Sequence, residues 1–145
     1  MPNKRVYSSK PIDHGNLLRT HWPELVRQAI AVRKKAYAPY SKFKVGSALL
    51  TDQGEIFTGC NVENASYGLA ICAERSAIVS AVSNGRQNFV AIAVAADPLA
   101  VPCGACRQFI FQFGKNIIVR SFETKRPEAF QEWTSSQLLP DGFEF

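Results

Sequence analysis

The chain has 145 residues, of which 46% are hydrophobic and 20% are charged. Its length is that of a single domain, and its composition is that of a globular protein, which argues against a disordered chain. No apolar run approaches the roughly 20 residues that a membrane-spanning helix needs, and no apolar stretch follows the basic N-terminus as in a secretory signal. These features predict a cytoplasmic protein.

The formal net charge is +5, which raises the question of a nucleic-acid partner. The basic residues are dispersed from the first residues to the neighbourhood of the C-terminus, without a dense run of Lys and Arg interleaved with aromatic residues. The pattern therefore favours a solvated basic surface over a nucleic-acid groove.

The first predicted helix follows an N-terminal segment without periodicity. Residues 1–22 show no sustained apolar spacing, and we interpret them as an arm of unknown function that precedes a domain over residues 23–145. From Pro23 onward apolar residues recur at helical spacing, and Pro23 suits the first turn of a helix. The helix should end before Pro39, because the residue before a proline resists helical geometry.

The middle of the chain alternates strand and helix patterns. Residues 43–64 contain two β-type runs around Asp52-Gln53-Gly54, which predicts a hairpin. Residues 71–85 have helical spacing and end on Asn84-Gly85. Residues 89–97 form a continuous apolar run, which is typical of a strand covered on both faces.

The last third continues the alternation. Residues 102–114 predict a short helix, residues 116–122 a buried strand, and residues 136–139 a final short helix. This order predicts an α/β fold with a central mixed sheet and helices on its faces.

Three cysteines give the strongest chemical signal. Cys103 and Cys106 open one predicted helix and Cys72 opens another. If these two helix starts lie side by side, three thiolates converge, and the positive ends of the helices lower the cost of keeping them charged. Three soft ligands suit tetrahedral Zn²⁺ and leave one position open, as in catalytic zinc sites.

Two charged residues follow the first of these cysteines. Glu74 lies two residues beyond Cys72, where a carboxylate can move protons without ligating the metal. Arg75 lies within one helical turn of Cys72 and can offset the charge of three thiolates by donating a hydrogen bond to sulfur.

The cysteines also allow other interpretations. A lone C-x-x-C is also typical of a redox pair or of half a structural zinc site, and Cys60 could complete a four-cysteine site. Cys60 lies in an alternating strand, where a cysteine is more often a small core residue. A redox pair would not need Glu74, so the combination favours catalytic zinc.

Together with these residues, four motifs resemble the small homotetrameric cytidine deaminases, over residues 23–143. The motifs are Tyr37-Ala38-Pro39-Tyr40-Ser41-Lys42-Phe43, Asn61-Val62-Glu63-Asn64-Ala65-Ser66-Tyr67-Gly68, Cys72-Ala73-Glu74-Arg75 and Pro102-Cys103-Gly104-Ala105-Cys106-Arg107-Gln108. The last two match the signature of the zinc deaminases that act on nucleobases. The resemblance implies a three-layer fold with a central mixed five-stranded sheet. It also implies hydrolytic deamination of cytidine and deoxycytidine to uridine and deoxyuridine, a step of pyrimidine salvage.

The resemblance also assigns roles to single residues. It implies that Cys72, Cys103 and Cys106 hold Zn²⁺ and that Glu74 is the proton shuttle. The implied substrate contacts are Asn61 and Glu63 to the ribose, Phe43 stacking on the pyrimidine, the main chain of Ala73 to the base, and Phe143 closing the site of a neighbouring subunit. A site shared in this way implies a homotetramer that acts on a free nucleoside.

The sequence departs from the family pattern before the Pro-Cys pair. Val101 stands where the family usually has serine, and the role attributed to that position is mainly that of a backbone carbonyl. Valine is therefore compatible with activity, although it can alter local hydration or substrate preference. The segment 1–22 also lies outside the family pattern.

Three rival functions remain at this level. A deaminase of the antibiotic blasticidin S would have little use for ribose contacts from Asn61 and Glu63. A deaminase of single-stranded nucleic acid would need an open site, which Phe143 of a neighbouring subunit should close. A non-catalytic zinc module would need a fourth protein ligand and no Glu74.

Overall fold

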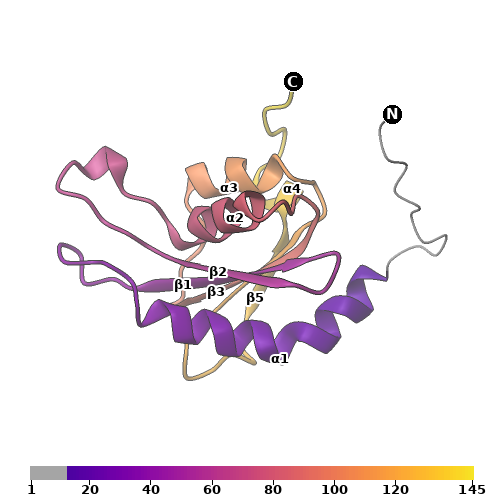
Figure 1. Ribbon diagram of the computed structural model, residues 1–145, viewed down its shortest axis with the longest axis horizontal. Helices are drawn as coiled ribbons and strands as arrows, with labels where there is room; N and C mark the ends of the chain where they lie inside the picture. Colours follow the sequence, from indigo (N-terminus) through magenta and orange to yellow (C-terminus); the bar gives the residue numbers. More distant parts are fainter. Residues whose placement is uncertain (1–12) are drawn as a thin grey trace.

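The computed structural model describes residues 13–145. Four α-helices, one short 3₁₀ helix (η1) and five strands follow one another along the described chain (Figure 1). In order, they are α1 (His14–Arg33), β1 (Val45–Thr51), β2 (Ile56–Cys60), η1 (Tyr67–Leu69), α2 (Ala73–Ser83), β3 (Phe89–Ala96), α3 (Gly104–Phe111), β4 (Ile118–Phe122), β5 (Gln131–Thr134) and α4 (Ser135–Leu138).

The strands form one mixed sheet in the order β2-β1-β3-β4-β5. β1 pairs antiparallel with β2 and β3, β3 pairs parallel with β4, and β4 pairs antiparallel with β5. The parallel step is the one that α3 connects, as a crossover of two parallel strands requires. The predicted five-stranded mixed sheet is confirmed.

Helices cover both faces of the sheet, which confirms the predicted three layers (Figure 1). One face packs on α1, where Leu25 and Ala29 meet Ala48 and Leu50 of β1. The other face packs on α2 and α3, where Ile78 and Ile110 belong to the same cluster of buried side chains. Every residue of the central strand β3 is buried, because its side chains alternate between these two cores.

The predicted start of the first helix at Pro23 is wrong. α1 begins at His14, and Asp13 caps it by accepting a hydrogen bond from the Asn16 amide at 3.0 Å. Leu18 is buried, and Trp22 packs edge-on against Phe122, so residues 14–22 belong to the packed domain and not to an arm. The rest of the predicted arm, residues 1–12, lies outside the described residues.

Pro23 explains the error. Proline most often marks the first turn of a helix, but here it lies inside α1, where it removes one backbone donor. Burial of the apolar face on both sides of Pro23 offsets that loss, since Leu18 and Leu25 contact the same face of the sheet.

The strand β5 was not identified from the sequence. It has four residues, Gln131–Thr134, and two of them are exposed, so it lacks the apolar alternation of a longer strand. It is held by pairing with β4 and by an ion pair between Arg120 and Glu132, whose Nε and Oε2 atoms lie 2.6 Å apart. The other predicted elements agree with the structure, including the hairpin, the turn at Asn84-Gly85 and the closing helix.

Gly59 allows α2 to lie directly on β2. A Cβ atom at Gly59 would lie 2.3 Å from the Ala77 amide nitrogen and 2.7 Å from the Ala73 carbonyl oxygen. These atoms belong to the helix backbone, which has no side chain to move aside. The absence of a side chain at position 59 therefore fixes how closely the first turns of α2 approach the sheet.

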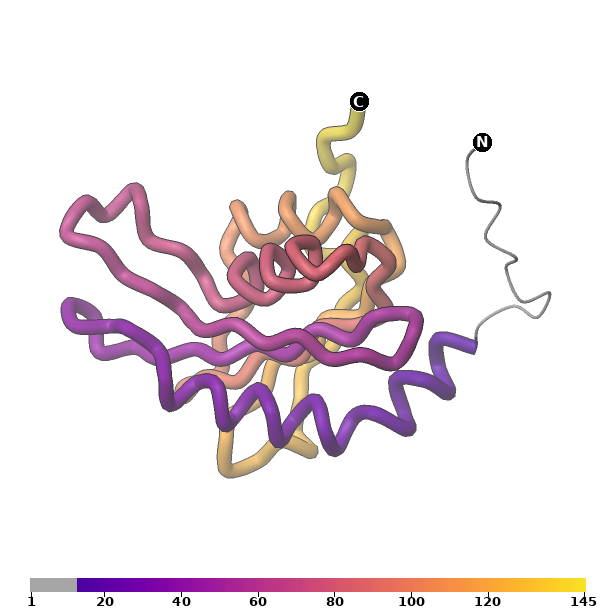
Figure 2. The backbone as a smooth tube through the Cα atoms, in the orientation of Figure 1, coloured from indigo at the N-terminus to yellow at the C-terminus, as the bar shows by residue number. Residues whose placement is uncertain are grey.

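Two loops project side by side beyond one end of the sheet, as Figure 2 shows. Residues 34–44 follow α1, and residues 61–72 follow β2. An isolated bridge from Tyr37 to Val62 ties the two loops together through their backbones, and a second bridge joins Val62 to Ile71 within the later loop. They bring distant parts of the sequence to the start of α2.

We expect Gly59→Ala to destabilise the protein by about 1–3 kcal/mol, because the added methyl group must push α2 away from β2. Urea denaturation followed by circular dichroism measures this change. Gly68→Ala is the matched control: a Cβ atom there meets nothing within 4 Å. Its free energy of unfolding should stay within about 0.5 kcal/mol of the original value. Equal stability of the two variants would contradict the packing argument.

Candidate active site

Cys72 and Cys103 are the N-cap residues of α2 and α3, and Cys106 lies in the first turn of α3. Neither N-cap side chain makes a capping hydrogen bond, so both sulfur atoms are free for another use. The positive ends of the two helix dipoles meet at these sulfurs and favour their thiolate forms.

The three sulfur atoms lie close enough to share one metal ion. The Sγ atoms of Cys72, Cys103 and Cys106 are all within 4.8 Å of one another, and those of Cys72 and Cys103 are 3.6 Å apart. Tetrahedral zinc with Zn–S bonds of about 2.3 Å places its sulfur ligands about 3.8 Å apart, so the triad fits Zn²⁺. No fourth His, Cys, Asp or Glu of residues 13–145 joins the group, and Cys60 lies outside it, as predicted.

Glu74 is buried beside the sulfurs, with 5% of its surface exposed. Its Oε2 atom lies 3.5 Å from the Cys106 Sγ atom. Burial raises the pKa of the Glu74 carboxyl, and the nearby charge of Cys72 raises it further. A carboxyl group in this position is next to the metal site without belonging to the sulfur triad.

Arg75 also contacts the sulfur triad, at Cys72. Its Nη2 atom donates to the Cys72 Sγ atom at 3.5 Å, which is the contact that the sequence spacing suggested. The pKa of the Cys72 thiol falls to about 5, chiefly because it accepts a hydrogen bond from the Cys106 thiol and also because of the bond from Arg75. The Cys106 thiol, which donates to Cys72 and is buried, has a raised pKa.

A cavity of about 330 Å³ opens onto Cys72, Glu74 and Cys103. Four of the five predicted substrate-binding residues line it, and the fifth, Phe143, does not. The lining residues are Ser41, Phe43, Val45, Asn61, Val62, Glu63, Ala70, Ile71, Cys72, Ala73, Glu74, Ala100, Val101 and Cys103. The cavity thus joins the two projecting loops to the starts of both helices.

Phe143 lies apart from this cavity in the single chain. Its side chain is 69% exposed and packs edge-on against Phe145, while its carbonyl accepts a hydrogen bond from Gln108 of α3. Val101, by contrast, lies in the cavity wall and is 45% exposed, so the family's usual serine is replaced by an apolar contact surface.

The side chain of Asn61 also has a structural task that the sequence did not reveal. Its Oδ1 atom accepts from the Val45 amide, and its Nδ2 atom donates to the Phe43 carbonyl, both at 2.8 Å. Asn61 therefore fixes the backbone that carries Phe43. Each of its polar atoms can still make one further hydrogen bond.

Arg107 is a second positioning residue that sequence reasoning left without a role. It donates to the Pro102 carbonyl at 2.8 Å and to the Leu138 carbonyl at 2.9 Å. These bonds fasten the turn before Cys103 to the end of α4. An arginine one residue after a C-x-x-C pair is the only local signal of this contact.

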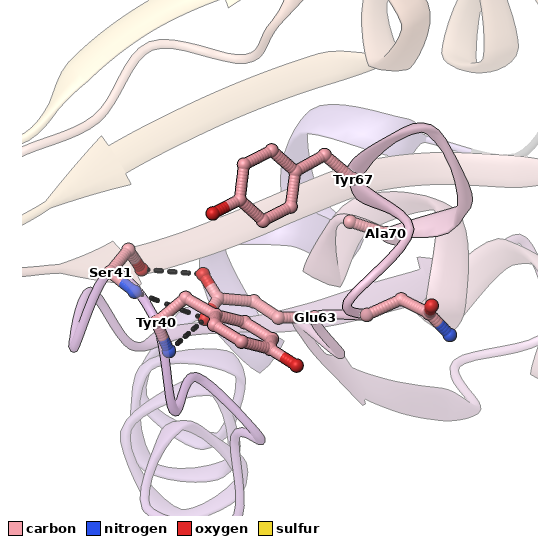
Figure 3. A pocket seen from close by; sticks show the side chains of 6 residues that line it. Tyr40, Ser41, Glu63, Tyr67 and Ala70 are labelled. Carbon is pink, nitrogen blue, oxygen red and sulfur yellow. Dashed lines mark hydrogen bonds between the residues drawn. The ribbon is translucent and has the colours of Figure 1, made fainter.

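A second cavity of about 410 Å³ adjoins the first and shares Ser41, Glu63 and Ala70 with it (Figure 3). Tyr40 and Tyr67 lie across it in an edge-on arrangement, with ring centroids 5.9 Å apart. In Figure 3 the Glu63 carboxylate points toward Ser41 and the backbone of Tyr40. Hydrogen bonds from these groups, first from the Ser41 side chain, lower the pKa of the Glu63 carboxyl.

Comparison with known proteins identifies the class of this site. A family model described as the cytidine and deoxycytidylate deaminase zinc-binding region matches residues 20–121, which include the three cysteines and Glu74. The chain is therefore a zinc-binding protein of the deaminase class.

Similar proteins identify the family within this class. The cytidine deaminase of Sporosarcina psychrophila is 45% identical over 123 residues, which cover 83% of this chain and 89% of that protein. The crystal structure of the cytidine deaminase from Burkholderia pseudomallei has 46% identity and a TM-score of 0.78, and covers 83% of this chain and 98% of that one. The crystal structure of the Mycobacterium tuberculosis cytidine deaminase has 36% identity and a TM-score of 0.74, over 86% and 98% of the two chains. The chain belongs to the cytidine deaminase family.

Within residues 13–145, none of the helices has both the length and the apolar character needed to cross a bilayer.

We expect Cys106→Ala to lose zinc, because it removes a sulfur that lies within 4.8 Å of both other sulfurs. The unchanged chain should bind about one zinc ion, measured by plasma mass spectrometry after gel filtration. Cys60→Ala is the control, since it also removes a thiol but leaves the triad intact, and it should keep its zinc. Loss of zinc from Cys60→Ala would show that the triad is not the whole metal site.

Proposed function

We propose that the chain catalyses the hydrolytic deamination of cytidine and deoxycytidine. The products are uridine or deoxyuridine and ammonia, and the reaction belongs to pyrimidine salvage. The observation that carries this proposal is the burial of Glu74 beside three convergent cysteines, at the floor of a cavity that Phe43, Asn61 and Glu63 also line.

Cys72, Cys103 and Cys106 hold the metal. When bound, zinc supplies a Lewis acid that activates water at neutral pH. No fourth His, Cys, Asp or Glu of residues 13–145 joins the three cysteines, so a tetrahedral Zn²⁺ held by them would keep one ligand position for water. This donor set supports catalysis over a purely structural zinc module.

Glu74 moves the protons of the reaction. Its carboxylate takes one proton from the attacking water and delivers it to N3 of the cytosine ring. Protonation of N3 makes C4 more electrophilic, so that it accepts the water oxygen. The water oxygen forms a bond to C4, its second proton passes through the same carboxyl group to N4, and the C4–N4 bond breaks, so that cytidine and water give uridine and ammonia. Glu74 lines the cavity, and its Oε2 atom lies 3.5 Å from the Cys106 sulfur, which supports a role in proton transfer next to the metal site.

Four residues recognise the nucleoside. The Phe43 ring stacks on the pyrimidine, and the main chain of Ala73 contacts the base. Asn61 and Glu63 keep hydrogen-bonding capacity beyond the contacts described above, and they bind the ribose hydroxyls with it. Ribose contacts of this kind favour a nucleoside over blasticidin S.

The enzyme works as a homotetramer in the cytosol. Phe143 is exposed on the surface of one chain, where it is available to close the cavity of a neighbouring subunit over a free nucleoside. A closed cavity leaves no path for a nucleic-acid strand. The three cysteines are free thiols, and a reducing compartment preserves them as metal ligands.

Glu74→Gln should keep its zinc and lose activity. The amide preserves the shape of the side chain but cannot exchange protons, so we expect kcat for cytidine to fall by about 10²–10⁴-fold. The loss of ultraviolet absorbance of cytidine and deoxycytidine, with ammonia release, measures turnover, and blasticidin S serves as the competing substrate. Glu128→Gln, at an exposed position away from the cavity, is the matched control. A fully active Glu74→Gln enzyme would overturn the mechanism.

A shared site can be tested with mixed tetramers. Phe143→Ala should raise KM for cytidine about tenfold, since an aromatic contact to the bound nucleoside is lost. Co-expression of Phe143→Ala with inactive Glu74→Gln subunits should restore low-KM turnover, because each complete site then takes Glu74 from one subunit and Phe143 from another. Sedimentation velocity checks that the mixed particles are tetramers, and a mixture no more active than its parts would exclude shared sites.

A further inference from the structure

The Glu63 carboxylate holds the loop that carries Phe43. Its Oε1 atom accepts from the Tyr40 amide at 2.9 Å and from the Ser41 amide at 3.2 Å. Its Oε2 atom accepts from the Ser41 hydroxyl at 2.6 Å, a distance typical of a hydroxyl bonded to a charged carboxylate (Figure 3). These three bonds use most of the roughly four lone-pair positions that a carboxylate offers.

The Ser41 hydroxyl connects Glu63 to Phe43. It donates its one proton to Glu63, and it accepts from the Phe43 amide at 3.0 Å. The Phe43 carbonyl is held separately, by Asn61. Both polar groups of the Phe43 backbone are thus fixed by side chains, one through Ser41 and the other through Asn61.

The loop needs such bonds because its backbone is not in a favoured conformation. Lys42, between Ser41 and Phe43, has a φ of +60°, in the left-handed region that residues other than glycine seldom adopt. Hydrogen bonds on both sides of Lys42 hold this turn in place. Loss of the Ser41 hydroxyl leaves the Phe43 amide without its partner and frees the turn to relax.

We propose that Ser41 is a positioning residue. Its hydroxyl group connects the Phe43 backbone to the Glu63 carboxylate and so fixes the Phe43 ring at the wall of the substrate cavity. The proposal rests on the proposed function, in which Phe43 stacks on the base and Glu63 binds the ribose. One carboxylate then serves two tasks: it fixes the aromatic contact through Ser41 and offers its remaining acceptor position to a ribose hydroxyl. Base stacking and sugar binding are coupled through a single hydroxyl group.

Three variants test the proposal. Ser41→Ala should raise KM for cytidine about tenfold and change kcat by less than about threefold, because ground-state positioning is lost while Glu74 and the metal ligands are untouched. Ser41→Thr keeps the hydroxyl and should recover most of the loss. Ser83→Ala, an exposed serine at the end of α2, is the control for loss of a surface hydroxyl and should behave as the unchanged enzyme.

A double-mutant cycle separates positioning from a general structural effect. In a Phe43→Ala background, Ser41→Ala should add less than about a twofold change in KM, since the ring to be positioned is gone. An undiminished effect of Ser41→Ala in that background would overturn the proposal, as would a KM for Ser41→Ala equal to that of the unchanged enzyme.

Failure of this proposal can be told apart from failure of the proposed function. Absence of cytidine turnover by the unchanged, zinc-loaded protein would refute the proposed function. Uridine affinity, measured by titration calorimetry on the same variants, tests the positioning role of Ser41 independently of turnover. Ser41→Ala should weaken uridine binding by the same factor by which it raises KM, and equal affinities would overturn the positioning role.

Discussion

The direct contact between α2 and β2 is the constraint on which the rest of the site depends. Gly59 lets the helix backbone lie on the strand, and the start of that helix carries Cys72 as its N-cap and Glu74 in its first turn. α3 brings Cys103 and Cys106 to the same point. Because ligand geometry tolerates only small displacements, the spacing between the helices and the sheet sets whether three sulfurs can share one ion.

The residues that we propose for ribose recognition, Asn61 and Glu63, also hold the fold together. Asn61 and Glu63 form hydrogen bonds to the backbone of residues 40–45 and also line the cavity. A polar residue with this double task is restrained before the substrate arrives, so less conformational entropy is lost on binding. The site is therefore preorganised by contacts that also stabilise the fold.

Much of the architecture was predictable from local patterns. The hairpin around Gly54 and the helix after Cys72 have clear periodicity or turn residues, and the strands at residues 89–96 and after α3 have short apolar runs. The metal site was predictable because cysteine spacing and helix starts determine it together, and the three sulfurs do converge.

The errors and omissions have physical causes. Pro23 carries the local signal of a helix start, whereas packing on the sheet extends α1 back to His14. β5 depends on its pairing with β4 and not on its own composition. The bonds from Tyr40 and Ser41 to Glu63 join residues more than 20 positions apart, so no spacing rule indicates them. The role of Phe143 depends on a neighbouring chain and remains a prediction.

The shortness of β5 has a consequence for how copies of this chain can meet. An edge strand exposes unpaired backbone N–H and C=O groups that can recruit a strand from another molecule. Within residues 13–145, β5 ends the sheet after only four residues, and Glu132 places a charge there. Such an edge is a poor template for extending the sheet from one molecule to the next. Open-ended backbone pairing across β5, which leads to fibres, is therefore disfavoured.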